Sequence, residues 1–283
     1  MDTQYFSPRS LEEAMQLAAG GDFRLLVGGT DVYPALGGKQ MGGRTIDLTR
    51  IPALDAIDVT AGAVRIGARV TWTGLIKAAL PPCFDGLKAA AREVGSRQIQ
   101  NRASIGGNLC NASPAADGVP PLLALNAGVE LASVAGVRRL ALADFIQGNR
   151  RTALRAGEIM TAIIVPPPGQ RAASVFRKLG SRSYLVISIA MVAVTLVAGD
   201  RGAVTEARIA VGACSPVARR LSGLEATLVG AKIAQGLGKL VQPRHLAGLS
   251  PIDDVRATAA YRMEAAHHLV RRALDDCAAR LAA

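Results

Sequence analysis

The sequence predicts an α+β fold, in which a region of mixed helices and strands is followed by an antiparallel sheet and then helices. Three observations support this prediction. Residues 24–41 read as a short apolar run, a glycine turn and a short helix, the order that is typical of α/β units. Prolines at 166–168 then interrupt the chain, because proline has no amide to donate. Beyond them, strand-like runs precede helical ones, as in an α+β domain.

The first part of the chain gives alternating helix and strand signals. Ser10 and Glu13 form a capping-box pattern, which predicts a helix that begins directly after Ser10. Pro120 favours the start of another short helix, since its missing amide is not needed in a first turn. Further strands are predicted at 45–49, 64–68 and 129–132, and further helices at 71–79 and 85–94.

Beyond the prolines the pattern changes. The apolar run at 184–199 is shorter than the roughly 18 residues that would span a bilayer, so it is predicted to be a buried strand pair or a core segment rather than a membrane span. The predicted strands lie at 174–178, 187–198 and 207–212, and the predicted helices at 217–228 and 255–281. We therefore expect a first domain at 1–170, with a small lobe at about 1–52 and a larger lobe at about 53–170, and a second domain at 171–283.

The charge of the chain is strongly basic and unevenly distributed. The net charge is +11, and residues 138–182 hold nine Lys or Arg against Asp144 and Glu158. Such a segment favours an anionic ligand or an acidic partner surface, and a solvated basic face is the alternative. Aromatic residues make up only 4%, and no basic stripe alternates with stacking residues, which argues against a nucleic-acid partner.

Cysteine and histidine usage indicates no metal site. The four cysteines are far apart and form no C-x-x-C pair, and the three histidines have no ligand spacing with a carboxylate or cysteine. A disulfide framework is not expected in so long a chain with so few cysteines. The first residues lack a positively charged apolar signal region, so a cytoplasmic location is expected.

Two glycine-rich stretches are the candidate binding motifs. Gly28–Asp31 follows an apolar run, so its amides can form a nest for an anion. Ser104–Asn108 offers a second nest within 104–117, a stretch whose turn formers and lack of apolar periodicity argue against helix and strand. Two nests suit a pyrophosphate, and Asp117 suits a ribose hydroxyl or an adenine amine. Together they predict a dinucleotide site. A simple tight turn is the alternative for either stretch, and neither matches the Rossmann or P-loop pattern.

These motifs resemble those of a known family. The stretches LLVGGTD at 25–31 and ASIGGNLCNASPAAD at 103–117 are similar to the two FAD loops in the FAD-binding medium subunits of molybdenum hydroxylases, such as xanthine and carbon monoxide dehydrogenases. Further similar stretches follow in the order of the family at 158–166, 176–182, 212–219 and 261–274. The resemblance implies a two-lobed FAD-binding domain of the vanillyl-alcohol-oxidase type, followed by a smaller α+β domain.

The resemblance also implies individual FAD contacts. Met160 and Lys178 would lie beside the isoalloxazine, where an ammonium group stabilises negative charge on a reduced flavin, and Asp117 would lie near the ribose or adenine. The alternatives are a basic surface residue for Lys178 and a helix N-cap for Asp117. Val94 stands where relatives carry an aromatic residue beside the flavin. The implied cofactor-binding residues are Leu25, Leu26, Val27, Gly28, Gly29, Thr30, Asp31, Val32, Ser104, Ile105, Gly106, Gly107, Asn108, Asp117, Met160 and Lys178.

The function that the resemblance implies is electron transfer within a complex. The chain would carry FAD, receive electrons from [2Fe-2S] clusters of a small iron-sulfur subunit, and pass them to NAD or oxygen. A large molybdopterin-binding subunit would complete a dimer of heterotrimers. Four scattered cysteines cannot hold such clusters, so the chain would be an oxidoreductase only within the complex. The alternatives are a self-sufficient FAD oxidoreductase and a basic binding module without enzymatic activity.

Overall fold

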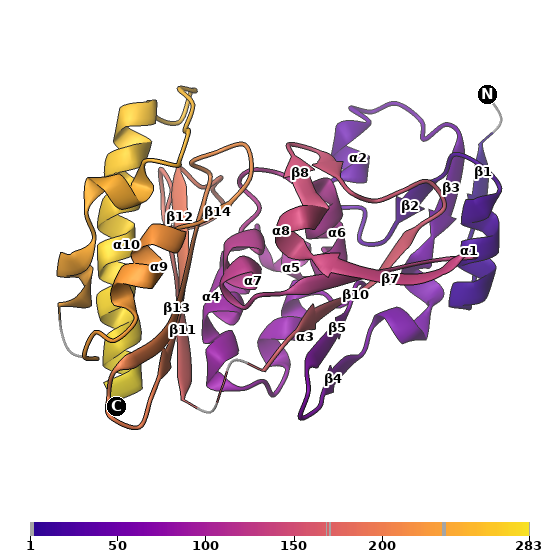
Figure 1. Ribbon diagram of the computed structural model, residues 1–283. Coiled ribbons are helices and arrows are strands. Elements are labelled where there is room, and N and C mark those ends of the chain that lie inside the picture. The colour runs from indigo at the N-terminus through magenta and orange to yellow at the C-terminus, as the bar shows by residue number, and fades with distance from the viewer. Residues whose placement is uncertain (1–2, 168, 170, 234–235, 283) are drawn as a thin grey trace.

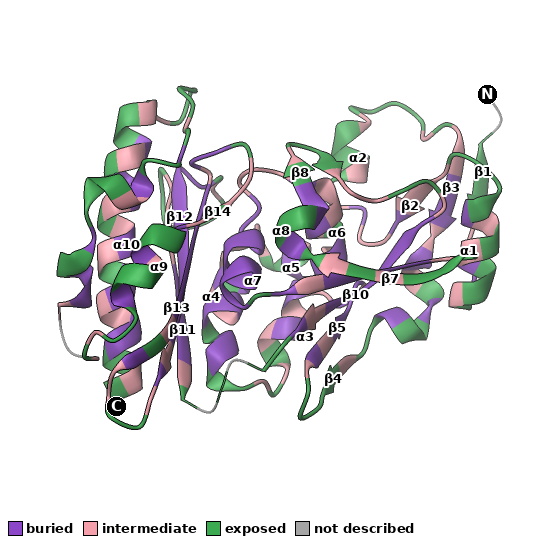
Figure 2. Ribbon diagram, in the orientation of Figure 1, coloured by how far each residue is buried: buried purple, intermediate pink, exposed green. Residues whose placement is uncertain are grey.

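The structure, a computed structural model, describes residues 3–167, 169, 171–233 and 236–282. Three sheets follow one another along an elongated molecule, with the N-terminal strands at one end and the C-terminal helix at the other (Figure 1). Buried residues are concentrated in the sheets and on the helix faces that cover them (Figure 2). The α+β organisation that the sequence predicts is confirmed.

The N-terminal sheet is small and parallel, with strand order β1-β3-β2. Its helix α1 begins where the capping pattern predicts, because the Ser10 hydroxyl accepts the amide of Glu13 at 3.1 Å. The Glu13 carboxylate accepts the amide of Arg9 rather than that of Ser10. The elements are β1 (Gln4–Phe6), α1 (Leu11–Ala19), β2 (Arg24–Leu26), α2 (Val32–Ala35) and β3 (Arg44–Asp47). The first cofactor motif lies in the loop between β2 and α2.

The central sheet is antiparallel and has the strand order β4-β5-β10-β6-β7. Six of the seven residues of β10 are buried, since this strand has neighbours on both sides. The strands are β4 (Ile57–Val59), β5 (Val64–Gly67), β6 (Gly128–Ser133), β7 (Gly136–Ala141) and β10 (Ile159–Val165); α8 (Leu142–Phe145) leads into a hairpin of β8 (Ile146–Gly148) and β9 (Arg151–Thr152).

Five short helices fill the space between the central and C-terminal sheets. Thr71, Ser96 and Ser104 each cap one of them by accepting the amide three residues ahead. The helices are α3 (Trp72–Lys77), α4 (Asp85–Glu93), α5 (Arg97–Arg102), α6 (Ile105–Asn111) and α7 (Val119–Ala124). Single 3-10 turns precede them at η1 (Leu48–Arg50), η2 (Pro52–Leu54) and η3 (Pro82–Phe84).

The C-terminal sheet is antiparallel and is covered by helices on both faces. The helices α9 and α10 pack on one face, and α4 and α7 pack on the other (Figure 1). The predicted buried strand is β12, whose residues are apolar almost throughout because both of its faces are covered. The elements are β11 (Ala172–Leu179), β12 (Ala190–Ala198), β13 (Val204–Gly212), β14 (Arg219–Arg220), α9 (Ser222–Leu228), η4 (Leu237–Leu240), η5 (Pro243–Leu246) and α10 (Ala259–Ala282).

Three predicted helix boundaries are wrong. The helix α2 ends early because Gly37 and Gly38 adopt positive φ angles. The helix α9 begins late, since the two residues of β14 pair with β13 instead. The helix α10 also begins late, because the Asp254 carboxylate accepts the amides of Arg256 and Ala257 in a turn. Within the described residues, no helix has the length and apolar character needed to cross a membrane.

Candidate cofactor site

The first glycine loop packs directly against the second motif. A Cβ atom on Gly28 would overlap the carbonyl oxygen of Arg102, which lies two residues before Ser104. Gly29 has a φ of 70°, a conformation that side chains disfavour, and its Cα faces the ring of Tyr33. Gly28 is therefore required by the approach of the two motifs to one another, and Gly29 by its own backbone conformation and by the nearby ring of Tyr33.

The second motif is a helix rather than the loop that the sequence predicts. The Ser104 hydroxyl accepts the amide of Gly107 at 3.0 Å and so caps α6. A Cβ on Gly106 would lie 2.6 Å from the carbonyl oxygen of Ala68, so this glycine lets the helix pack on the backbone after β5. Gly107 is exposed, and a Cβ there would meet only the Ser104 hydroxyl, at 2.9 Å. Gly106 thus allows α6 to pack against Ala68, whereas Gly107 leaves the exposed surface of α6 free of a side chain.

Only the first motif keeps its backbone amides free. In the described part of the chain, none of the N–H groups of Gly28–Asp31 has an acceptor. By contrast, Ile105 donates to the carbonyl of Val70 and Gly106 to that of Ala68, each at 2.9 Å. The prediction of two equivalent amide nests is therefore wrong. The first loop offers donors to an anion, and α6 offers a smooth glycine surface opposite it.

Three adjoining cavities form the site. A cavity of about 380 Å³ lies between the two motifs and is also lined by Trp72. It shares Val94 with a cavity of about 360 Å³ that includes Asp117. It shares Asp31 and Asn111 with a third cavity of about 550 Å³, which extends to the C-terminal sheet. Volumes of this size are typical of cofactor pockets, and the shared walls make an elongated site that suits a dinucleotide.

Two polar atoms in the wall of the first cavity have no partner. The Asn108 side-chain oxygen and the Trp72 indole nitrogen are buried and make no hydrogen bond within the described residues. Buried polar groups are hydrogen-bonded in the great majority of cases, so such atoms indicate a missing partner. The residues present therefore fit a polar ligand such as FAD at this place.

Asp117 and Lys178 form a buried ion pair beside the second cavity. Lys178 Nζ donates to Asp117 Oδ2 at 2.7 Å, and the Ser188 hydroxyl donates to Oδ1 at 2.7 Å. Lys178 also reaches the carbonyl of Glu93 at 3.5 Å. Burial raises the pKa of Asp117, while the charge and hydrogen bond of Lys178 and the hydrogen bond of Ser188 oppose the rise. Gly118 is the N-cap of α7, which removes the alternative role of Asp117 as a cap.

The structure sorts the sequence-predicted residues into two groups. Those that line the first two cavities are Val27, Gly28, Gly29, Thr30, Asp31, Val32, Ser104, Gly107, Asn108 and Asp117. Those that line none of the three cavities are Leu25, Leu26, Ile105, Gly106, Met160 and Lys178. Met160 is 4% exposed and belongs to the core on β10, so its contact with a flavin ring stays a prediction.

Part of the cavity wall comes from residues that the sequence patterns do not indicate. Trp72, Ile99 and Cys110 line the first cavity, and Leu185–Ile187 line the second. Cys110 lies within the second motif, and the other residues lie in no glycine-rich turn and have no characteristic spacing. The one available signal is that Trp72 is the only tryptophan of the chain.

Comparison with known proteins identifies the family of the chain. Residues 1–168 match the FAD binding domain in molybdopterin dehydrogenase, and residues 174–277 match the CO dehydrogenase flavoprotein C-terminal domain. The chain is 35% identical over 240 residues to the nicotinate dehydrogenase FAD-subunit of Eubacterium barkeri, covering 82% of this chain and 81% of that subunit. It is 30% identical over 282 residues to the nicotine 6-hydroxylase medium subunit of Paenarthrobacter nicotinovorans, covering 98% of both.

Solved structures of similar proteins have the same fold as this chain. The fold matches carbon monoxide dehydrogenase from Hydrogenophaga pseudoflava with a TM-score of 0.90 at 29% identity, over 99% of this chain and 98% of that one. Quinoline 2-oxidoreductase from Pseudomonas putida 86 gives the same TM-score at 27% identity, over 99% and 98% of the two chains. The chain therefore belongs to the family of FAD-binding subunits of molybdopterin dehydrogenases, and it is an oxidoreductase subunit whose cofactor is FAD.

Proposed function

We propose that the chain is the electron-transfer subunit of a molybdenum hydroxylase complex, and that it passes electrons from [2Fe-2S] clusters on a partner subunit to an external acceptor. The observation that carries this proposal is the set of free amides at Gly28–Asp31, which face α6 across one cavity. Such amides suit a diphosphate. Bound FAD would supply a carrier that accepts electrons singly or in pairs.

The clusters and the molybdenum cofactor belong, in this proposal, to a small and a large partner subunit. Burial raises the pKa of Cys83 and Cys214 to about 11, and that of Cys110 and Cys277 to about 12. An iron-sulfur cluster needs several cysteines close together, and among the described residues no group of three or more His, Cys, Asp or Glu side chains is placed to hold a metal ion. The relative from Hydrogenophaga pseudoflava is named a medium chain, which supports a complex of several subunits. A dimer of heterotrimers is the assembly that we expect.

Different residues of this chain would bind the diphosphate of FAD and adjust the reduction potential of its flavin. The amides of Gly28–Asp31 would bind the diphosphate, and Gly107 would leave room for it. We propose that Lys178, held by Asp117, places its positive charge near the flavin end of the site and favours the reduced form. Asp117 would hold the ammonium group in place and still accept a hydrogen bond from the cofactor, since each carboxylate oxygen has two lone pairs. Because the two side chains are in contact, they lie at the same end of the site, so in this proposal Asp117 faces the flavin end rather than the adenine.

The third cavity is the proposed place of a charged acceptor such as NAD. Arg150, Arg256 and Arg262 contribute three guanidinium groups to its wall, and they pair with only two carboxylates, those of Asp31 and Asp254. The Arg262 Nε is buried without a partner among the described residues. An excess of positive charge next to the flavin cavity suits the diphosphate of a nicotinamide dinucleotide.

The test is to release the cofactor with acid from the purified complex and to identify it by chromatography. FAD in a near one-to-one ratio to this chain is expected, together with iron and molybdenum on the copurified subunits. Recovery of FMN alone, or of no flavin, would contradict the proposal. Iron and acid-labile sulfide on this chain by itself would contradict the assignment of the clusters to a partner.

The domain boundaries and the cellular location are two further proposals. We propose that residues 1–170 form the FAD-binding domain, with lobes at about 1–52 and 53–170, and that 171–283 form the C-terminal domain. The division near 170 is supported by the change from the central sheet to the C-terminal sheet there. A cytoplasmic location is also proposed, and cell fractionation would test it.

A further inference from the structure

Besides the three cavities of the candidate cofactor site, the molecule has a groove along strand β14. This strand is the last of the C-terminal sheet and has no neighbour on its outer edge. Among the described residues, the backbone groups of 217–220 make hydrogen bonds only to β13. An open strand edge is a template to which another extended chain can add.

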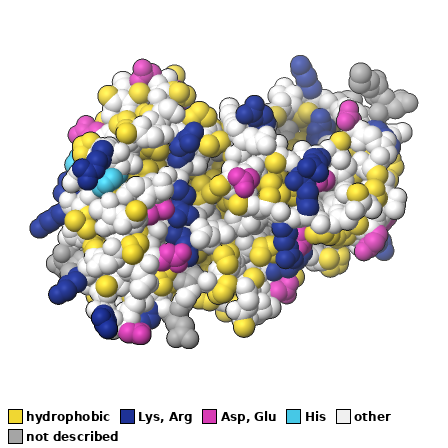
Figure 3. Space-filling model, in the orientation of Figure 1, with side chains coloured by type: hydrophobic (Ala, Val, Ile, Leu, Met, Phe, Trp, Pro, Cys, Tyr) yellow, Lys and Arg dark blue, Asp and Glu magenta, His cyan; other side chains and the backbone are white. Residues whose placement is uncertain are grey.

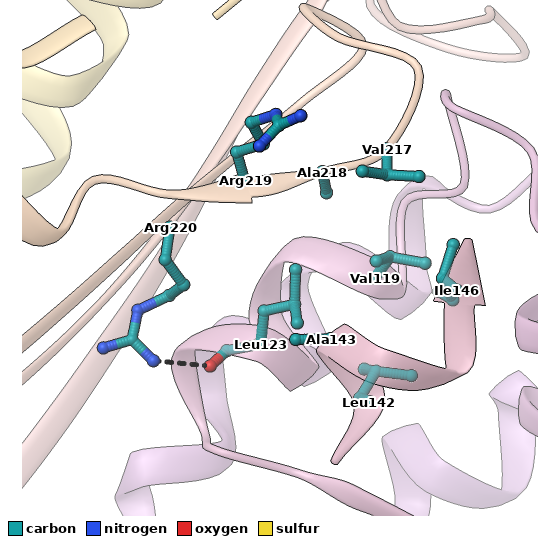
Figure 4. A pocket seen from close by; sticks show the side chains of 9 residues that line it. All are labelled: Val119, Leu123, Leu142, Ala143, Ile146, Val217, Ala218, Arg219 and Arg220. Atoms are coloured by element: carbon teal, nitrogen blue, oxygen red, sulfur yellow. Dashed lines mark hydrogen bonds between the residues drawn. The ribbon is translucent and has the colours of Figure 1, made fainter. Parts of the chain in front are cut away.

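One end of the groove is apolar. A cavity of about 230 Å³ lies between β14 and the helices α7 and α8, and the side chains of Val119, Leu142 and Val217 point into it (Figure 4). Arg220 fixes the strand above this hollow, because its guanidinium donates to the carbonyl of Leu123 at 3.2 Å. The hollow is therefore held open by bonded elements and fits one apolar side chain.

The other end of the groove is basic. A cavity of about 440 Å³ shares Arg219 and Arg220 with the apolar hollow and continues past α9 to Arg244. Arg220 is neutralised by Glu225, at 2.8 Å. Arg219 and Arg244 are exposed, and neither has a carboxylate partner in the part of the chain that the structure describes. Lys and Arg side chains form a row along the border of the C-terminal sheet on this face, next to a hollow of apolar atoms (Figure 3).

We propose that this groove, defined by β14 and its two cavities, docks an extended acidic segment of a partner subunit. The segment adds to the free edge of β14, places an apolar side chain in the hollow, and sets carboxylates beside Arg219 and Arg244. An extended chain rises about 3.3 Å per residue, so one segment of several residues can meet both ends of the groove. The inference rests on the proposed function, because that function requires partner subunits.

The charge of the chain indicates whether a different subunit or a second copy of this chain occupies the groove. The chain has a net charge of +11, and two copies would bring the same unpaired arginines together. Like charges that face each other across an interface are unfavourable, whereas an acidic segment is attracted. The occupant we infer is therefore a segment of a different subunit that is rich in Asp or Glu.

The experiment compares two double variants of the flavin-loaded chain for binding to the remaining subunits. Arg219→Glu with Arg244→Glu is expected to raise the dissociation constant at least about tenfold, since each new charge repels the segment. Arg50→Glu with Arg201→Glu makes the same change of net charge at exposed residues outside the groove, and is expected to bind as the wild type does. The difference is expected to shrink between about 50 mM and about 300 mM salt, because salt screens exposed charges.

A third variant tests the apolar end without changing charge. Ala143 is exposed at the mouth of the hollow, so Ala143→Trp is expected to block it and weaken binding at both salt concentrations. A photo-crosslinking residue in place of Ser222 is expected to capture an acidic peptide of the partner, identified by mass spectrometry.

The outcomes separate this inference from the proposed function. If the wild-type chain binds partner subunits and all groove variants bind equally well, the groove is not the docking site and the proposed function stands. Crosslinks only to a second copy of this chain would also overturn the inference. A wild-type chain that copurifies with no other subunit would overturn both. Flavin content, expected to be unchanged in every groove variant, shows that the variants are folded.

Discussion

Lys178 Nζ lies 2.7 Å from Asp117 Oδ2, and the two side chains are only 6% and 9% exposed. Asp117 precedes α7, and Lys178 stands near the end of β11, so the pair joins the central helices to the C-terminal sheet. The contact lies at the wall of the second cavity. We therefore expect this pair to affect both the stability of the chain and the candidate cofactor site.

Removing one partner of this pair is expected to destabilise the chain more than removing both. Lys178→Met leaves a buried carboxylate uncompensated, which costs about 3–5 kcal/mol of unfolding free energy. Adding Asp117→Asn to the same chain removes that charge and should restore part of the loss. Urea unfolding of the flavin-free proteins measures both effects. Equal losses in the single and double variants would show that the pair is not coupled in this way.

Lys178→Met is also expected to lower the reduction potential of the flavin. If about 1.4 kcal/mol of charge stabilisation is lost, the potential of a two-electron couple falls by about 30 mV. The double variant should show a smaller fall than the single variant, because Asp117→Asn also removes the uncompensated negative charge that Lys178→Met leaves beside the site. Spectroelectrochemical titration of the assembled complex at full flavin content measures it. An unchanged potential with reduced stability would leave Lys178 a purely structural role.

Gly107→Val is expected to reduce flavin content to less than half while the fold stays intact. The new side chain would project from α6 toward the cavity opposite the first loop. Its contact with the rest of the protein is limited to the Ser104 hydroxyl, so the apoprotein should lose no more than about 1 kcal/mol, the range of helix propensities. The measurements are the ratio of flavin to protein absorbance and thermal unfolding.

The matched control is Gly223→Val, which changes another exposed glycine of a short helix, in α9. It should keep its full flavin content. Gly106→Ala provides a contrast, since its Cβ would press on the backbone of Ala68. This variant should lower the stability of the fold more than it lowers flavin binding. If Gly107→Val binds FAD fully, α6 does not face the diphosphate.

Stability in acid is expected to depend on Glu158. Hydrogen bonds from the Arg138 guanidinium, together with the amide of Arg155, hold the pKa of this carboxyl below 4.5. The folded chain therefore binds this proton less readily than the unfolded chain, so unfolding takes up a proton. The stabilisation is present above about pH 4.5 and is lost as the pH falls through the lower folded value.

The measurement for Glu158 is the free energy of unfolding between about pH 6 and about pH 3. Glu158→Gln should lower stability at the upper end and flatten the fall toward acid. Glu12→Gln changes an exposed carboxyl on α1 and should give the same dependence of unfolding free energy on pH as the wild type. A Glu158→Gln curve parallel to that of the wild type would show that this carboxyl does not contribute.

Arg256→Ala is expected to raise the KM for NADH in dye reduction about tenfold with little change in kcat, if the third cavity holds the dinucleotide. Loss of one charged hydrogen bond to a phosphate removes about 1.5 kcal/mol or more of binding. Arg50→Ala, at an exposed arginine outside all the cavities described here, is the control. Equal KM values for the two variants, or no reaction with NADH in the wild type, would contradict NAD as the acceptor.

Local sequence was sufficient for several elements. The cap of α1 depends on Ser10 and Glu13, which are neighbours on one turn, and the buried strand β12 depends on an unbroken apolar run. The glycine loop after β2 was also predictable, because strand, glycine turn and helix follow directly in the chain. Resemblance to the FAD-binding medium subunits extended this local information to the kind of cofactor.

Tertiary structure alone decided how the site is assembled. The sequence around Gly106 reads as a loop, but α6 forms because Ser104 caps it and because its first amides bond to the backbone that follows β5. Gly28 is required by the carbonyl of Arg102, and Asp117 finds its partner in Lys178 across 61 residues. Such contacts form between distant parts of the chain and leave no periodicity in the sequence. Sequence by itself therefore determined which segments carry the candidate cofactor motifs, and packing determined which amides, glycines and charges line the candidate site.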